Sequence, residues 1–157
     1  MSQTHESKLQ ATMQQFEDLK AHVLQAALNG DAIHEVERSI WRQLLAIGLN
    51  FIHGFVLAQG DGNMGKTFEL EDGRTLTRLP EPHARRYVSI FGDFEISRRV
   101  YGTRETQKIQ AAPLDARLQL PESELSHVLQ EWSQMFSVRD SFAGAGESVE
   151  SLLGIGQ

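Results

Sequence analysis

The strongest constraint on the fold is a long helical pattern between residues 33 and 59. Apolar residues recur there at spacings of three and four, which places them on one face of a helix: Ile33, Val36, Ile40, Leu44, Ile47, Phe51 and Phe55. Further apolar residues fill its other faces between residues 40 and 58. A helix that is apolar on most sides has to be covered by protein. The cover is either the rest of this chain or a second copy, so a homodimer through residues 33-58 is one prediction.

A membrane span is another interpretation of the same segment. Four polar residues interrupt it, namely Arg42, Gln43, Asn50 and His53, and its clean part is shorter than the ~20 residues that a bilayer requires. Residues 1–10 are polar and contain no signal core. The chain has no cysteine, which is compatible with a reducing compartment. We therefore expect a cytoplasmic protein with no membrane partner.

A second helical pattern precedes this one. Its apolar positions share one helical face and are Leu9, Met13, Phe16, Leu19, Val23 and Ala27. Asn29 and Gly30 end the pattern, and Asp31 is expected to cap the helix that follows. Residues 1-60 are thus predicted to form a helical hairpin, with dimerisation as its role.

Residues 85–104 have the period of two half-buried strands. Gly92-Asp93 is predicted to join them in a tight turn. Such an antiparallel hairpin would bring Arg86, Arg98, Arg99 and Arg104 to one basic rim.

The charge distribution also singles out this part of the chain. The net charge is −6, yet residues 74–108 carry 8 Lys or Arg against 4 Asp or Glu, and both flanking segments are acidic. A local basic region matters more for nucleic-acid binding than the total charge. The candidate contacts to DNA phosphates are Arg85, Arg86, Arg98, Arg99, Arg104 and Lys108. The alternative is that these residues only solubilise an exposed sheet face.

Gly60 to Thr67 satisfies the phosphate-loop pattern Gly-x-x-x-x-Gly-Lys-Thr letter for letter. That loop holds phosphates only where a strand enters it and a helix leaves it. Here a long helix enters, and the residues that leave alternate like a strand. A flexible link between helices and sheet is therefore preferred over a nucleotide site.

Two further strands are expected around the Asp72-Gly73 turn, one after Lys66 and one over Thr75–Leu79. With the central hairpin they make a small antiparallel sheet of about four strands in residues 61-112. The predicted fold class is α+β: an N-terminal helical hairpin, this sheet with its basic rim, and a C-terminal helical pair in residues 113-157.

The C-terminal part begins with a linker, Pro113 to Pro121, anchored by Leu114 and by Leu118 or Leu120. Pro121-Glu122 is expected to start a helix that ends near Phe136. A second short helix is expected from Ser137 to about Leu153. The pair has the form of the start of a helix-turn-helix or of an ordinary helical hairpin. Glu147 and Glu150 in the second helix would repel DNA phosphates.

Three ordered segments carry a resemblance to a known family. They are Arg86 to Phe94, Arg99 to Gly102, and Pro113 to Pro121. In order and spacing they resemble the amino-terminal region of bacterial insertion-sequence transposases of the ISKra family, over residues from about Gly60 to Gly154.

The resemblance implies a role in DNA transposition, with the DNA of the element ends as the partner. In that family a ribonuclease H-like domain follows, whose Asp, Asp and Glu bind two divalent metals for strand cleavage and joining. This chain ends where that domain would begin, so a truncated or split open reading frame is expected, with a separate catalytic polypeptide. We expect no catalytic residue, no cofactor and no metal site in this chain. Relatives with a cysteine zinc ribbon after Tyr101 differ from this chain, which has no cysteine.

A function of another class remains open at this stage. The chain would then be a structural homodimerisation module without nucleic-acid binding. Changing Arg98 and Arg99 to Glu separates the two, because the change abolishes DNA retention only if these residues bind DNA.

Overall fold

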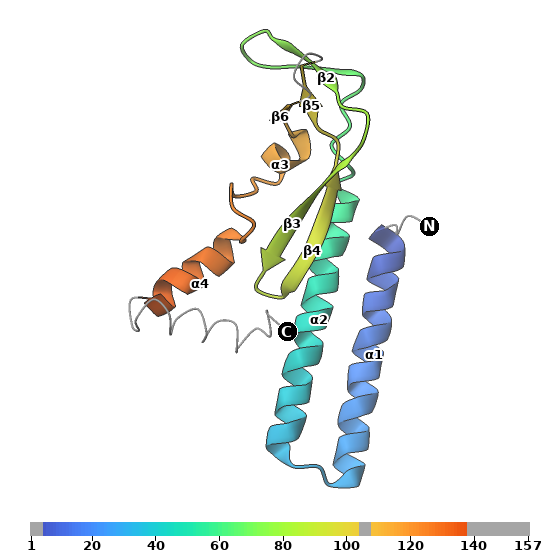
Figure 1. Ribbon diagram of the computed structural model, residues 1–157. Coiled ribbons are helices and arrows are strands. Elements are labelled where there is room, and N and C mark those ends of the chain that lie inside the picture. Colours follow the sequence, from blue (N-terminus) through green and yellow to red (C-terminus); the bar gives the residue numbers. More distant parts are fainter. Residues whose placement is uncertain (1–4, 104–107, 138–157) are drawn as a thin grey trace.

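The computed structural model describes residues 5–103 and 108–137. It confirms the α+β class, with a helical hairpin at one end, antiparallel strands in the middle and helices after them (Figure 1). The helices are α1 (His5–Asn29), α2 (Ile33–Ala58), α3 (Pro113–Arg117) and α4 (His127–Ser137). The strands are β1 (Thr67–Glu69), β2 (Thr75–Arg78), β3 (His83–Ser89), β4 (Gly92–Arg98), β5 (Tyr101–Gly102) and β6 (Ile109–Ala111).

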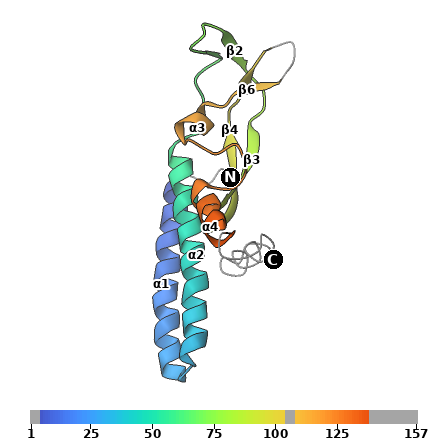
Figure 2. The ribbon, with the colours of Figure 1, turned by 90° about the vertical axis from the view of Figure 1, so that its left-hand side faces the viewer.

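Helices α1 and α2 lie side by side in an antiparallel pair, and their turn projects beyond the rest of the described chain (Figures 1 and 2). Two polar contacts join them along their length. Asn50 donates a hydrogen bond of 2.7 Å to Gln15, and Ser39 lies 2.8 Å from the His22 ring. These pairs fix the register of the helical hairpin, because a shift along the axis would leave half-buried polar groups unpaired.

The prediction that Asp31 caps α2 is wrong. The residue before α2 is Ala32, and no side chain caps the helix. The Asp31 N–H instead bonds to the Ala26 carbonyl at 3.0 Å, and the Gly30 N–H bonds to Ala27. With Gly30 in the left-handed region (φ 72°), these bonds form a Schellman motif that closes α1. Asp31 therefore belongs to the end of the first helix.

The strands form two sheets. The four-stranded sheet has the order β1-β2-β5-β6, and β3-β4 is a separate two-stranded hairpin. All pairings are antiparallel. The predicted sheet of about four strands is therefore present. Its strands are β1, β2, β5 and β6, and the central hairpin forms a sheet of its own. Gly102 in β5 lies so close to β6 that a Cβ there would stand 2.2 Å from the Lys108 carbonyl oxygen.

The turn of the β3-β4 hairpin lies two residues earlier than predicted. Ser89 pairs with Gly92, so Ile90 and Phe91 form the turn and Gly92 begins β4. The reason is tertiary: Phe91 packs on α2, where a Cβ at Gly48 would meet its ring at 2.5 Å. The Ser89 hydroxyl donates to the Gly92 carbonyl and accepts from the Phe91 N–H, which closes this turn.

The segment after β6 also differs from the prediction. Pro113 is not in an open linker but in the first turn of α3, where its ring suits the helix start. Residues 121–126 are not helical, because the Val88 backbone bonds to Glu124 and Ser126 in a parallel bridge beside Leu125. Helix α4 starts only at His127, where the Ser126 hydroxyl accepts the Leu129 N–H at 3.1 Å. Ser137, predicted to start a second helix, is the last residue of α4, and the rest of that predicted helix lies outside the described residues.

Two apolar clusters hold these parts together. Ile96 of β4 meets Val56 of α2 and Leu114 of α3, while Val88 of β3 meets Leu129 of α4. The β3-β4 hairpin therefore lies between α2 and the segment that carries α3 and α4 (Figures 1 and 2). Leu114 is fully buried, as expected of a linker anchor.

Within the described residues, α2 is the one helix long and apolar enough to cross a membrane, and only 17% of the relevant window is buried. A single helix of this kind is weak evidence for a span, because core helices and signal sequences have the same composition. Among the exposed apolar side chains of α2 are Trp41, Leu44, Phe51 and Phe55.

The contact between α2 and β4 predicts a dependence of stability on pH. His53 stacks on Phe94 with ring centroids 4.7 Å apart. Burial, with a smaller contribution from Lys8, lowers the pKa of His53 from its usual 6.5. The folded state therefore resists protonation, so its free energy of unfolding falls as the pH drops below about 6.5 and through the lowered pKa. Urea unfolding at pH about 7.5 and about 5.5 measures this fall.

We expect His53→Gln to weaken that pH dependence. His34→Gln, an exposed change in the same helix, is the control and should leave it as in the wild type. An equal pH dependence in the wild type and in His53→Gln would contradict the assignment.

Candidate nucleic-acid interface

The register of β3-β4 decides where the predicted arginines point. Arg85 is opposite Ile96, and Arg98 is opposite His83. Side chains alternate along a strand, so Arg85 and Arg98 share the face that carries Tyr87, Phe94 and Ile96. Arg86 is on the other face. The single basic rim predicted for Arg86 and Arg98 is therefore wrong. Arg86 pairs with Glu95, and Arg98 lies three residues further along β4, so this odd-numbered step puts the two arginines on opposite faces of the hairpin.

Arg85 and Arg98 both bind Asp115 of α3. The Arg85 Nη1 and Asp115 Oδ2 atoms are 2.9 Å apart, and the Arg98 Nε and Asp115 Oδ1 atoms are 2.7 Å apart. The three side chains are only 16%, 11% and 18% exposed, in the order Arg85, Arg98, Asp115. Two cations thus share one carboxylate in a largely buried cluster.

The contact between Arg98 and Asp115 is an ion pair without a well-aligned hydrogen bond. Among the described residues neither Arg98 Nε nor Asp115 Oδ1 has a hydrogen-bond partner, despite their short separation. Arg98 Nη1 donates to the His83 carbonyl at 3.2 Å. Arg85 donates to the carbonyls of Pro121 and Ser123, the latter at 2.9 Å. The guanidinium groups of Arg85 and Arg98 are therefore occupied inside the chain.

Arg86 and Arg99 lie nearer the surface. Arg86 pairs with Asp93 at 3.0 Å and with Glu124 at 3.7 Å, and its side chain is 53% exposed. Arg99 pairs with Asp61 at 3.3 Å and donates to the Pro80 carbonyl. The exposed pair of Arg86 is weak, so its guanidinium can exchange its partner for another anion. The Arg99 side chain is 29% exposed and the Asp61 side chain 49%, so that pair is half-buried but still open to solvent.

The two remaining candidates are Arg104 and Lys108. Arg104 is outside the described residues. Lys108 is exposed and immediately precedes β6.

The sequence analysis did not identify three of the acids that pair with these arginines, namely Asp61, Asp115 and Glu124. Asp115 lies in the first turn of α3, behind Pro113. A proline followed by an acid is a helix-start signal, and it could have placed this carboxylate on a helix. The pairing itself joins residues 30 apart in the chain for Arg85, which no local spacing indicates.

The loop that matches the phosphate-binding pattern lies between α2 and β1, as the sequence predicted. Three of its backbone amides are already bonded. The Asn63 and Gly65 N–H groups donate to the side chains of Asp61 and Asn63, and the Met64 N–H donates to the Tyr101 hydroxyl at 2.7 Å. That hydroxyl in turn donates to the Gly65 carbonyl. In this conformation, these three amides are not available to a phosphate.

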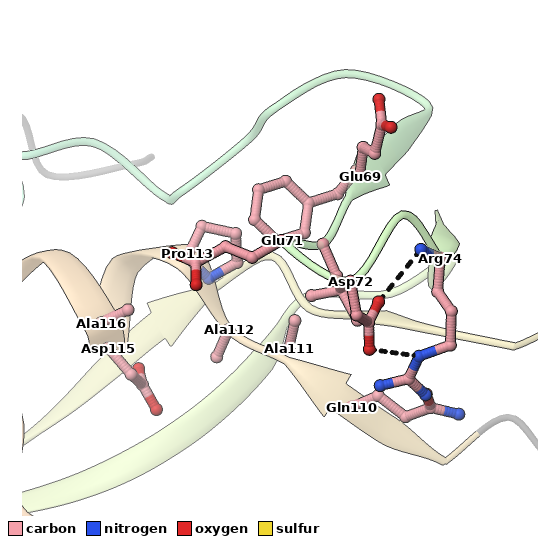
Figure 3. Close-up of a pocket in the computed structure, with 12 residues that line it drawn as sticks. Glu69, Glu71, Asp72, Arg74, Gln110, Ala111, Ala112, Pro113, Asp115 and Ala116 are labelled. Atoms are coloured by element: carbon pink, nitrogen blue, oxygen red, sulfur yellow. Dashed lines mark hydrogen bonds and ion pairs between the residues drawn. The ribbon is translucent and has the colours of Figure 1, made fainter.

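A pocket of about 800 Å³ lies between the β1-β2 turn, β6 and α3 (Figure 3). Four acids line it, Glu69, Glu71, Asp72 and Asp115, with Arg74. The backbone N–H and the guanidinium of Arg74 bond to Asp72 and lower the pKa of its carboxyl. An acidic lining disfavours a phosphate ligand.

Within residues 5–103 and 108–137, no group of three or more His, Cys, Asp or Glu side chains could hold a metal ion. Comparison of the chain with protein-family models, with curated proteins and with solved structures gives no match.

The Asp115 cluster predicts a large loss of stability on removal of its carboxylate. Asp115→Asn leaves Arg85 and Arg98 facing each other in a largely buried site. We expect the free energy of unfolding to fall by about 3 kcal/mol, the low end of the range for a buried pair. Urea unfolding measures it. Asp72→Asn, which breaks an exposed pair with Arg74, is the control and should change stability little. Equal effects of the two variants would show that the cluster does not stabilise the fold.

The hydrogen bonds of the Tyr101 hydroxyl predict that removing this one oxygen atom loosens the loop. Tyr101→Phe removes both hydrogen bonds and should lower the free energy of unfolding by about 1 to 2 kcal/mol. The Met64 amide should then exchange faster with solvent, which hydrogen-exchange NMR detects. Lys66→Ala, at an exposed loop position, should leave this rate unchanged. Unaltered exchange at Met64 in Tyr101→Phe would contradict the role given to the hydroxyl.

Proposed function

We propose that this chain is the non-catalytic, DNA-binding and assembly part of an insertion-sequence transposase. It brings copies of the protein together on the DNA of the element ends during transposition in the cytoplasm. Support comes first from the three segments that resemble ISKra-family transposases. They overlap β3, β4, β5 and α3. The first and third segments pack on one another, because Tyr87 and Phe94 belong to the same apolar cluster as Leu114, Leu118 and Leu120.

The observation that carries the assembly role is the exposure of apolar side chains on α2. Trp41, Leu44, Phe51 and Phe55 are 46%, 43%, 48% and 56% exposed. Four large apolar residues on successive turns of one helix form a patch that soluble proteins normally cover with a partner. Association with another chain provides that cover.

The proposed DNA contacts are Arg86, Arg99 and Lys108, which reach solvent at least in part, together with Arg104, which lies outside the described residues. Weak surface pairs can yield to phosphates, because DNA offers a high density of negative charge. Arg85 and Arg98 have a different role in this proposal. They hold Asp115 and so position β3-β4 against α3, which sets where Arg86 and Arg99 emerge.

Strand cleavage and joining belong, in this proposal, to a separate catalytic polypeptide or segment. The divalent metals of that chemistry would bind there.

A second candidate function is a homodimerisation module without nucleic-acid binding. One observation favours it: Arg85, Arg86, Arg98 and Arg99 all have acidic partners within the chain. Neutralised arginines attract DNA less strongly than free ones.

Titration with labelled duplex from the element ends, and with scrambled duplex, tests the proposal. We expect selective binding by the wild type that weakens as salt rises. Arg86→Gln with Arg99→Gln should lower affinity on both duplexes and reduce the salt slope by about 2, which is about 1 per lost phosphate contact. The matched control is Arg38→Gln with Arg42→Gln, which removes the same charge from exposed positions of α2.

The two candidates differ in their outcomes. Binding that is reduced only by the Arg86 and Arg99 changes supports the DNA-binding role. No binding by the wild type at low salt, with association of the chain retained, favours the dimerisation module instead.

A further inference from the structure

The exposed apolar residues of α2 have counterparts on α1. Met13 and Phe16 of α1 are 59% and 52% exposed. At the turn between the helices the exposure is higher still, with Leu28 and Ile33 both at 82%. The exposed apolar surface therefore belongs to both helices of the hairpin.

The helix register shows that these residues lie on one face. The α1 residues buried at the contact recur every seven positions, as Thr12, Leu19 and Ala26. In α2 the corresponding residues are Ile47 and Gly54, with Leu9 packed on Gly54.

Two antiparallel helices in contact are related by a local two-fold axis perpendicular to their common plane. Residues at the same offset from a contact residue thus lie on the same side of the pair. The exposed apolar residues follow contact positions by one or four in both helices: Met13 and Phe16 follow Thr12, Phe51 follows Ile47, and Phe55 follows Gly54.

They form a single surface, which we call the hairpin face. It consists of Met13, Phe16, Lys20, Glu37, Trp41, Leu44, Phe51 and Phe55.

The strands cover a different side of α2. Leu45 packs with Val88, Leu49 reaches Gly92, and Val56 packs with Ile96. These three residues are offset around the helix from those of the hairpin face. The β3-β4 turn reaches the face at one point, where the Phe91 ring packs on Gly48 between Leu44 and Phe51. Packing within the described chain therefore covers the other sides of α2, and on this side it leaves Leu44, Phe51 and Phe55 about half exposed.

The spacing along α2 points to another helix as the cover. Glu37, Trp41, Leu44, Gly48, Phe51 and Phe55 follow one another at alternating intervals of four and three residues. This heptad spacing is the pattern by which helices pack along their length. Leu9, Met13, Phe16 and Lys20 repeat it on α1.

The charges identify that helix as belonging to a second copy. The heptad positions carry one cation, Lys20 on α1, and one anion, Glu37 on α2, and both are exposed. A two-fold interface requires a self-complementary surface. A face with opposite charges on its two helices meets that requirement without net repulsion, whereas a purely acidic or basic face would not.

We propose that the hairpin face binds the hairpin face of a second copy, so that α1 and α2 of both chains form a four-helix bundle. This inference specifies the assembly step of the proposed function and rests on it. It extends the interface predicted for residues 33-58 to α1.

Sedimentation equilibrium of the full chain without DNA tests the inference, from about 1 to about 100 µM. The wild type should have twice the 17.6 kDa mass of one chain. Leu44→Glu with Phe51→Glu should reduce the mass to one chain while circular dichroism retains its helix content. Met13→Glu with Phe16→Glu should do the same, because α1 supplies three of the eight residues of the face.

The matched control is Met64→Glu with Ile109→Glu. It adds the same two charges at exposed apolar residues outside the helices, which are 58% and 43% exposed, and it should remain dimeric.

Three results would overturn the inference. One is a wild type that has the mass of a single chain throughout. Another is a dimer that persists in both pairs of face variants. The third is a monomeric wild type that cosediments with phosphatidylcholine vesicles and loses this binding on Leu44→Glu with Phe51→Glu, since the face would then bind lipid. Selective binding to element-end duplex is measured separately, so a failed dimer does not by itself remove the DNA-binding role.

Discussion

The arrangement of the middle and C-terminal parts depends on one carboxylate between two guanidinium groups. Asp115 is in a short helix that could not stay in place alone, because five residues form barely more than one turn. Its bonds to Arg85 and Arg98 attach that helix to both strands of the β3-β4 hairpin. Arg85 also donates hydrogen bonds to the carbonyls of Pro121 and Ser123, in the segment that precedes α4. Removing charged groups from water costs free energy, which offsets part of the attraction between them. The cluster therefore orients α3 on the hairpin as much as it stabilises the fold.

Local chemistry predicted the elements well where the pattern was long or the turn residues were decisive. The recurrence of apolar positions at spacings of three and four predicted both long helices, and the Asp72-Gly73 turn predicted β1 and β2. The errors have a common cause. The Gly92-Asp93 turn, the helix start at Pro121 and the cap at Asp31 were all plausible locally. Each was displaced by a contact made with a distant residue or a neighbouring element, such as Phe91 on Gly48 or Val88 with Ser126.

The candidate site was predicted less well than the fold, for a related reason. A count of arginines along residues 85–104 describes charge but not the direction of each side chain. Register places Arg85 and Arg98 on the covered face of the hairpin, and Asp115 joins them from a different segment. Only Arg86 and Arg99 among the described arginines of this stretch keep a substantial part of their side chains in solvent, with weaker partners. In the proposed function, the exposed hairpin face binds protein, and the exposed arginines of the neighbouring strands bind DNA.

The close approach of β5 to β6 at Gly102 limits the sequences that this fold can accept. A side chain there would meet the Lys108 carbonyl at less than the contact distance of two atoms, and the obstacle is backbone rather than a flexible side chain. Random mutagenesis followed by selection for folded protein should therefore recover glycine alone at this position. The neighbouring Thr103, which is half-buried, should accept several residues. As substitutions accumulate in the gene, Gly102 should therefore remain glycine even where its neighbours change.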